Sequence, residues 1–311
     1  MIDWRESLTT VPVGNTPLVR LRRIVPAGAG EVWLKLESGN PTGSYKDRMA
    51  LAVVGGALER GDVAPGDRLV EYTGGSTGTA IAYAAARAGL RFTAISSDAF
   101  AAVKLRSMDA YGAEVLIEPS EGGKITPGLI ARMRDRATAL AAEPNSWYTD
   151  QFGNADIRPG YAPMGAEIAA VLGERLTVLC AGVGTGGALM GTIDGLEDAD
   201  CKPDVVVLEP TESPLLTTGT GGPHRVEGVG VGFAPPFLDR ARISDVRTVG
   251  QDEAVAMCRR LAVEEGMLCG TSTGLNVVAA VRLAVEQGPD SVIATFGVDN
   301  GAKYLEGGLF G

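Results

Sequence analysis

Short apolar runs alternate with helix-length segments through the first half of the chain. Runs with few polar positions are typical of strands buried on both faces, and segments with a 3.6-residue period indicate helices. A strand–helix series of this kind implies one parallel sheet with right-handed crossovers. The expected strands are 68–72, 91–96 and 113–119, and the expected helices are 76–88, 99–111 and 127–142.

A second series of the same kind begins after residue 153. We therefore expect two open, mainly parallel α/β sheets flanked by helices, with an active site in the cleft between the carboxyl ends of their strands. The expected elements are strands at 177–182, 204–210 and 291–297, a helix opened by GTGGALMG, helices at 251–265 and 273–287, and Gly- and Pro-rich loops over 211–242.

Composition agrees with this architecture. The chain has 311 residues, 45% of them hydrophobic and only 5% aromatic, so Ala, Val, Leu and Ile must build the core of one large or two medium domains. A net charge of −10 disfavours nucleic acid and anionic membranes as partners. The N-terminal MIDWRESLTT lacks the apolar stretch of a signal peptide, and we expect a cytoplasmic protein.

Cysteine and histidine usage narrows the chemistry. The four cysteines form no CxxC pair and the chain has one histidine, so we expect no metal site and four reduced, mostly buried thiols. A single histidine also disfavours Ser-His-Asp and Cys-His mechanisms, which makes lysine the first candidate for moving protons. The cysteines are Cys180, Cys201, Cys258 and Cys269.

Three segments could carry chemistry, and the first is NPTGSYKDR, residues 40–48. Lys46 follows a turn made by Pro41 and Gly43. A lysine that forms an imine must be partly desolvated so that its amine can be neutral near neutral pH. The alternative is an ordinary solvated lysine beside a helix N-terminus.

The second segment is TGGSTGT, residues 73–79, which follows a strand and opens a helix. Its outward backbone amides and the hydroxyls of Thr73, Ser76 and Thr77 suit a carboxylate or a phosphate. The alternative is a tight strand-to-helix turn with a Ser or Thr cap.

The third segment is GVGTGGALMG, residues 182–191, which matches G-x-G-x-x-G between a strand and a helix. Glu209 lies 22 residues after Gly187, where a dinucleotide-binding domain has its ribose-binding acid. An NAD-dependent oxidoreductase is therefore a rival. The other interpretation is a cup for a monophosphate, built from backbone amides and Thr185.

The combination favours the monophosphate. A phosphate cup, a turn of carboxylate size and a candidate imine lysine are the three parts that a pyridoxal-phosphate enzyme acting on amino acids needs. A nicotinamide enzyme has no use for the second of them.

The order of these segments resembles the cysteine synthase and cystathionine β-synthase family of fold-type II pyridoxal-phosphate enzymes. The resemblance extends over nearly the whole chain. Its segments are GNTPLVRL (14–21), KLESGNPTGSYKDR (35–48), TGGSTG (73–78), QFGNADIRPGY (151–161), GVGTGG (182–187), GPHRVEGVGVGF (222–233) and CGTSTG (269–274). His224 falls in a structural stretch of the family pattern, so we expect it to be non-catalytic.

The resemblance implies roles for individual residues. Lys46 matches the lysine that holds the cofactor as a Schiff base and moves the Cα proton. The other matched cofactor-binding residues are Ser76, Gly184, Thr185, Gly186, Gly187, Ala188 and Ser272, and the substrate-binding ones are Thr73, Gly74, Gly75, Thr77, Gln151 and Gly230.

Three positions depart from the family pattern. The common loop is Thr-Ser-Gly-Asn-Thr-Gly, whereas this chain has Gly74 in place of the Ser and Ser76 in place of the Asn. Ala188 stands where the phosphate loop commonly continues with Thr. Each loss removes about 0.5–3 kcal/mol of hydrogen bonding, which a covalently held cofactor tolerates, so the departures bear on the choice of substrate.

Ser272 matches the hydroxyl that meets the pyridine nitrogen, although it could instead cap the helix expected from residue 273. A neutral hydroxyl does not keep that nitrogen protonated, which favours losing a β-leaving group over a long-lived carbanion. The resemblance thus implies β-replacement on an O-acetylserine-like substrate by a sulfur nucleophile, through an aminoacrylate. Cystathionine β-synthase-type condensation, another β-substituted alanine synthase and a serine dehydratase stay open.

The resemblance also implies the domain organisation. Residues 1–45 and 154–311 would form a large domain that binds the cofactor phosphate, and residues 46–153 a smaller inserted α/β domain. The chain stops shortly after the last expected strand, and no Cys/His pair precedes GNTPLV to bind haem. We therefore expect a simple cysteine synthase-like homodimer that acts on small amino acids.

Overall fold

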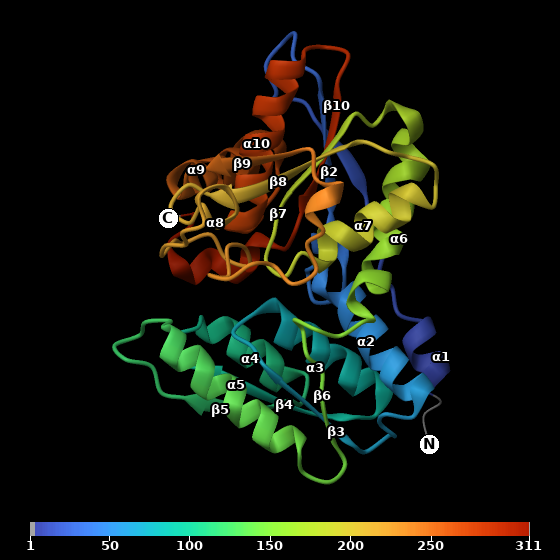
Figure 1. Ribbon diagram of the computed structural model, residues 1–311, viewed down its shortest axis with the longest axis vertical. Helices are drawn as coiled ribbons and strands as arrows, with labels where there is room; N and C mark the ends of the chain where they lie inside the picture. Colours follow the sequence, from blue (N-terminus) through green and yellow to red (C-terminus); the bar gives the residue numbers. More distant parts are fainter. Residues whose placement is uncertain (1–3, 311) are drawn as a thin grey trace. The chain divides into compact units, whose positions relative to one another are not determined.

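The computed structural model describes residues 4–310 and shows an α/β protein with two sheets (Figure 1). These residues divide into two compact units, which we describe separately. The smaller unit comprises the described residues up to Val13 together with Lys46–Gly160. The larger unit comprises Gly14–Tyr45 and the described residues from Tyr161 onward.

The smaller unit is built on a four-stranded parallel sheet of order β5-β4-β3-β6. Successive residues of β3 serve opposite faces, as the two-residue period of a strand requires: Leu69 packs with helices α2, α3 and α4, and Val70 packs with α5. The strands are β3 (Arg68–Tyr72), β4 (Arg91–Ser97), β5 (Glu114–Glu118) and β6 (Ser146–Tyr148), and the helices are α2 (Lys46–Arg60), α3 (Ser76–Ala88), α4 (Ala102–Ala110) and α5 (Pro127–Ala141).

The larger unit has a six-stranded sheet of order β1-β2-β10-β7-β8-β9, in which only the pair β1–β2 is antiparallel. Helices α9 and α10 cover one face, and α6 and α7 lie on the other (Figure 1). The strands are β1 (Leu18–Leu21), β2 (Glu31–Leu36), β7 (Val178–Gly182), β8 (Asp204–Pro210), β9 (Asp245–Val249) and β10 (Val292–Gly297). The helices are α6 (Ile157–Leu172), α7 (Gly187–Glu197), α8 (Leu215–Thr218), α9 (Gln251–Arg260) and α10 (Thr271–Gln287).

Two glycines bring the backbones of α6 and α7 into contact. A Cβ on Gly165 of α6 would lie far inside van der Waals contact with the carbonyl oxygen of Thr192. A Cβ on Gly195 of α7 would meet the carbonyl oxygen of Ala162 in the same way. We call this contact the glycine seam. It fixes α7, the helix that follows the phosphate-type loop, against its neighbour without any intervening side chain.

The predicted fold class is confirmed, and the expected strands end within one or two residues of the observed ones. Strands β1, β2, β6 and β9 were missed. Strand β6 has only three residues, and β9 alternates exposed and partly buried positions over its first four residues at the sheet edge. The helix expected over 251–265 is α-helical to Arg260 and continues as a π-helical turn to Glu265.

The N-terminal helix differs from the expected domain organisation, which assigned residues 1–45 to the larger domain. Helix α1 (Trp4–Thr9) instead packs with α2 and α3, where Leu8 joins their core. The Ser7 hydroxyl donates to the carbonyl of Arg87, and the Arg87 guanidinium donates back to the carbonyl of Ser7. Only one of the six residues of α1 is buried, and so weak a hydrophobic pattern does not predict this packing. Residues 1–3 lie outside the described part of the chain.

The expectation of reduced, buried thiols is confirmed, because Cys180, Cys201, Cys258 and Cys269 are all buried and unbridged. Within residues 4–310, no helix has the length and apolarity needed to cross a membrane.

Candidate active site

Lys46 is the first residue of α2, in the smaller unit. Its side chain is half-buried, and the two residues that follow it, Asp47 and Arg48, are buried. The surroundings therefore differ from those of an ordinary solvated lysine. Partial burial is what an amine needs if it is to lose its proton and act as a nucleophile.

The segment Thr73–Thr79 joins β3 to α3 as a turn rich in backbone amides, which we call the substrate loop. The helix has Gly75 as its N-cap and no side-chain cap, so the alternative of a Ser or Thr cap does not hold. The first amides of α3, at Ser76 and Thr77, have no intrahelical acceptor by position. A carboxylate placed there would meet both these amides and the positive end of a 13-residue helix.

Neighbouring side chains fill the space around the glycines of the substrate loop. A Cβ on Gly74 would overlap the ring of Phe100, and a Cβ on Gly78 would overlap the sulfur of Met108. The departure from the family pattern at Gly74 thus has a physical cause. Phe100 occupies the volume that a serine side chain would need.

Gln151 follows β6 and lies beside the substrate loop. Its Nε2 donates to the carbonyl of Tyr72 at 2.9 Å, directly before Thr73, and its backbone amide donates to Glu71 at 3.0 Å. The structure therefore brings Gln151 next to the substrate loop, although the two lie far apart in the sequence.

Glu71 is the residue that sequence analysis missed here. Its carboxylate is fully buried on β3 and accepts from the Thr149 hydroxyl at 2.6 Å and from the amides of Tyr72 and Gln151. Burial outweighs these hydrogen bonds and raises the pKa of Glu71 to about 7. Glu71 thus ties the end of β3 to the segment that carries Gln151.

In the larger unit, Gly182–Gly187 joins β7 to α7 and forms the phosphate-type loop. Gly186 has φ +86°, and a Cβ on Gly184 would lie 2.5 Å from the carbonyl oxygen of Gly228. The Thr185 hydroxyl accepts from the amide of Gly187 at 3.2 Å, and Ala188 is the second residue of the helix. A cup of glycines at the N-terminus of an 11-residue helix fits a phosphate group.

Glu209 decides against the dinucleotide alternative. Its buried carboxylate accepts from the amides of Leu216 and Thr217, at 2.7 and 3.0 Å, and from the Thr217 hydroxyl at 2.5 Å. These three bonds hold the first turn of α8. The carboxylate is therefore occupied by hydrogen bonds within the protein at the position where a dinucleotide-binding domain would use it to bind the ribose.

Ser272 is the second residue of α10 and is buried, whereas Gly270 is the N-cap. The capping role considered for Ser272 therefore does not hold. Asn276, one turn later, accepts from the amide of Gly182 at 2.8 Å and donates to the carbonyl of Phe296 at 2.9 Å. This residue was also missed, although its spacing of four from Ser272 places both on one helix face. It links the phosphate-type loop to α10.

Gly230 lies against the same loop. It has φ +58°, and its amide donates to the carbonyl of Val183 at 3.0 Å. The structure thus brings Gly230, Ser272 and the phosphate-type loop together in the larger unit, while Lys46, Gln151 and the substrate loop lie in the smaller one.

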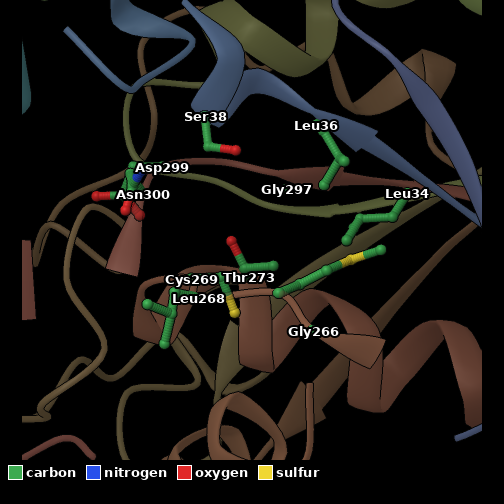
Figure 2. A pocket seen from close by; sticks show the side chains of 11 residues that line it. Leu34, Leu36, Ser38, Gly266, Leu268, Cys269, Thr273, Gly297, Asp299 and Asn300 are labelled. Carbon is green, nitrogen blue, oxygen red and sulfur yellow. The ribbon is translucent and has the colours of Figure 1, made fainter. Parts of the chain in front are cut away.

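A cavity of about 310 Å³ lies in the larger unit beside the start of α10 (Figure 2). Leu34 and Leu36 of β2 line one part, and Asp299 and Thr273 line another. The Thr273 hydroxyl accepts from the amide of Val298, and the Asp299 carboxylate accepts from the Tyr304 hydroxyl at 2.7 Å. The cavity adjoins Ser272 without including it, so it is separate from the predicted cofactor contacts.

Residues 9–296 match the family model of the pyridoxal-phosphate dependent enzymes. The chain belongs to this family. Within it, the chain is 36% identical over 302 residues to a probable cysteine synthase of Bacillus subtilis, an alignment that covers 96% of each protein.

Two solved structures of the family are similar throughout. O-ureido-L-serine synthase superposes with a TM-score of 0.88 at 36% identity, over 98% of this chain and 94% of that one. The O-acetylserine dependent cystathionine β-synthase of Helicobacter pylori gives a TM-score of 0.85 at 31% identity, over 100% and 99%. The expected family, the dependence on pyridoxal phosphate and the β-replacement class are confirmed.

Proposed function

We propose that this enzyme replaces the leaving group of an O-acetylserine-like substrate with a sulfur nucleophile and releases cysteine or a cysteine-like amino acid. The observation that carries the proposal is the junction of Gln151 with the substrate loop at the end of β3. An amide-rich turn at a helix N-terminus is suited to the α-carboxylate of an amino acid. Small amino acids are thus the expected partners.

Each matched residue has a proposed role. Lys46 holds pyridoxal phosphate through an imine and moves the Cα proton. Bound there, the cofactor supplies an electron sink for the Cα–H bond. The remaining proposed contacts are Gly184, Thr185, Gly186, Gly187 and Ala188 at the phosphate, Ser272 at the ring nitrogen, Ser76 at the ring oxygen, and Thr73, Gly74, Gly75, Thr77, Gln151 and Gly230 at the substrate.

The side chains of this chain favour elimination of the β-substituent. The buried Ser272 hydroxyl is neutral, so it would leave the ring nitrogen of a bound cofactor without a permanent counter-charge. Charge that develops at Cα is then relieved soonest by expelling a leaving group. Lys46, half-buried, can take up the Cα proton and return it after the nucleophile has added.

The departures at Gly74 and Ser76 keep neighbouring specificities within the proposal. Phe100 fills the space beside Gly74, and the family includes an O-ureido-L-serine synthase and an O-acetylserine dependent cystathionine β-synthase. Formation of O-ureido-L-serine, formation of cystathionine and dehydration of serine are therefore the competing reactions to be compared.

We also propose that the enzyme works as a homodimer in the cytoplasm. Four buried, reduced cysteines suit a reducing compartment. Large apolar side chains that stay exposed on the larger unit, such as Val263 and Leu305, support a subunit contact. Sedimentation of the purified protein tests the dimer.

The test of the function uses borohydride and turnover together. Reduction of the yellow protein, followed by digestion, should find the cofactor on Lys46, and a label on Lys35 or Lys104 would refute the assignment. Lys46→Ala should abolish β-replacement, while Lys124→Ala, at an exposed lysine, should not change it. Turnover of O-acetylserine with sulfide should exceed that of O-phosphoserine or serine; the reverse order would reassign the leaving group.

A further inference from the structure

We propose that His224 is a positioning residue, which holds the turn 224–230 between the phosphate-type loop and the start of α10 through a neutral imidazole protonated on Nε2. The inference rests on the proposed roles of that loop and of Ser272. His224 is the only histidine of the chain, and it lies outside every catalytic role assigned above. We call the turn 224–230 the histidine turn.

The protonation state follows from the two partners of the ring. The amide of Val226 lies 3.2 Å from Nδ1, and an amide can only donate, so Nδ1 must be bare. The carbonyl oxygen of Gly230 lies 3.0 Å from Nε2 and can only accept, so Nε2 must carry the proton. The two bonds close the turn from inside, and we call this pair of hydrogen bonds the latch. A ring protonated on both nitrogens would oppose its Nδ1 proton to the amide of Val226.

The histidine turn touches the phosphate-type loop along one side. The amide of Gly230 donates to the carbonyl of Val183, and the carbonyl of Gly228 lies so close to Gly184 that a Cβ there would come within 2.5 Å. Between these contacts, Val229 is buried against Gly182. Three successive residues of the turn therefore support the loop proposed to hold the cofactor phosphate.

The other side of the turn reaches α10. The amide of Glu227 donates to the Thr271 hydroxyl at 3.0 Å, one residue before Ser272. The histidine turn thus connects the loop proposed for the phosphate with the helix proposed for the ring nitrogen. Displacing the turn would loosen both ends of the cofactor at once.

The turn needs such a latch because its backbone has little intrinsic preference for this shape. Gly228 and Gly230 have φ values of +81° and +58°, and Gly232 has +84°. Glycines lose more conformational freedom on ordering than other residues do. Besides His224, the turn is anchored by the buried side chains of Val226 and Val229 and by the hydrogen bonds of its backbone amides.

The charged groups around the turn are already paired or turned outward. Arg225 donates from its exposed guanidinium to Asp252, and its amide donates to Gln251. The Glu212 carboxylate accepts from the amide of Gln251, and Glu227 contacts Thr271 through its backbone. The Gly182–Gly187 segment contributes no charged side chain. The contribution of His224 therefore comes from its own two hydrogen bonds.

The first test reads the tautomer directly. A ¹⁵N–¹H long-range spectrum of the holoenzyme at pH 8 contains one imidazole, so it needs no assignment. We expect one protonated nitrogen, Nε2, and one bare nitrogen, Nδ1, with no averaging between tautomers. A ring protonated on Nδ1, or the averaged shifts of a freely exchanging ring, would overturn the proposal.

The second test measures pyridoxal phosphate binding to apoprotein, without turnover. His224→Ala removes two neutral hydrogen bonds and should raise the dissociation constant about tenfold, while His224→Asn and His224→Gln, which each can restore one bond, should lie between. Arg225→Ala, next to the latch but directed to solvent, is the matched control and should bind like wild type. Equal binding by His224→Ala would refute the latch.

The conservative variants separate the latch from a merely structural role. His224→Asn and His224→Gln keep a polar side chain that can restore one of the two hydrogen bonds, so cofactor binding should recover in part in them and stay weak in His224→Ala. Equal weakening in all three variants would contradict the proposal. Failure of wild type to bind the cofactor at all would instead refute the proposed function.

Discussion

The substrate loop and the phosphate-type loop share one architecture but are supported by different kinds of atoms. Both follow a parallel strand, both are rich in glycine, and both open a helix. Side chains back the first, where Phe100 and Met108 occupy the space beside Gly74 and Gly78. Backbone atoms support the phosphate-type loop, where the carbonyl of Gly228 faces Gly184 and the amide of Leu238 faces Gly186.

This difference predicts which positions of the two loops can be substituted and which cannot. A side chain that fills a space can be exchanged for a smaller one, and the loop it supports can then change with it. A backbone carbonyl cannot be exchanged, so a glycine opposite it has no substitute. Accordingly, the departure at Gly74 lies beside the side chain of Phe100. The glycines that face backbone atoms, Gly184 and Gly186, match the family pattern.

Gly184→Ala should have the largest effect, because its Cβ meets a backbone oxygen that cannot rotate away. We expect a loss of about 3 kcal/mol of stability together with at least a hundredfold weaker cofactor binding. Thermal unfolding and titration of apoprotein with pyridoxal phosphate measure the two. No single side-chain truncation nearby should rescue the variant, and a rescue would remove the distinction between the loops.

Glu71→Gln should show that the support of the substrate loop is titratable. A raised pKa means that the folded state prefers the protonated acid, so this group's contribution to stability is full below about pH 4.5 and is lost as the pH rises to about 7. The Thr149 hydroxyl can turn to the carbonyl of Val70, 3.3 Å away, when Glu71 is protonated.

The unfolding free energies of wild type and Glu71→Gln should therefore diverge between pH 5 and pH 8, because wild type loses on the order of 3 kcal/mol relative to the variant that does not titrate. The KM for the amino-acid substrate of wild type should change over the same range. Glu114→Gln, at an exposed glutamate of the same sheet, is the control and should keep the wild-type slope. Parallel curves for Glu71→Gln and wild type would show that Glu71 does not titrate there.

Gly74→Ser should cost about 1–3 kcal/mol through overlap with Phe100, and Phe100→Ala should restore much of that loss. A double-mutant cycle on stability and on KM measures the coupling. A strong positive coupling energy would support the interpretation that the Phe100 ring excludes a side chain at position 74. Additive effects would mean that Phe100 is not what excludes a side chain at position 74.

Ser272→Ala should have the smallest effect, about 0.5–1.5 kcal/mol, because it removes one neutral hydrogen bond. Ser272→Asp should instead place an anion at the ring nitrogen, shift the visible spectrum of the holoenzyme and slow elimination. Melting temperature, spectrum and elimination rate distinguish these outcomes. An active Asp variant with an unchanged spectrum would contradict the assignment of Ser272.

Local patterns in the sequence were sufficient for most elements and for the glycine loops. The strands at 68–72 and 204–210 have the predicted bounds, because long apolar runs between turns leave few alternatives. The supports of the loops were not predictable. Glu71 reaches Gln151 across 80 residues and Asn276 reaches Gly182 across 94, and no local pattern records such pairs. The departure at Gly74 was visible, but its cause, Phe100, required the fold.

The glycine seam between α6 and α7 also predicts how the larger unit exchanges its amide hydrogens with solvent. Helices whose backbones touch cannot separate by moving side chains, so the middle of α7 should exchange only when the whole unit unfolds. Its first turn, at Gly187 and Ala188, can open on its own. Slow exchange around Gly195 should therefore persist in apoprotein, and protection gained on adding cofactor should be confined to the start of the helix.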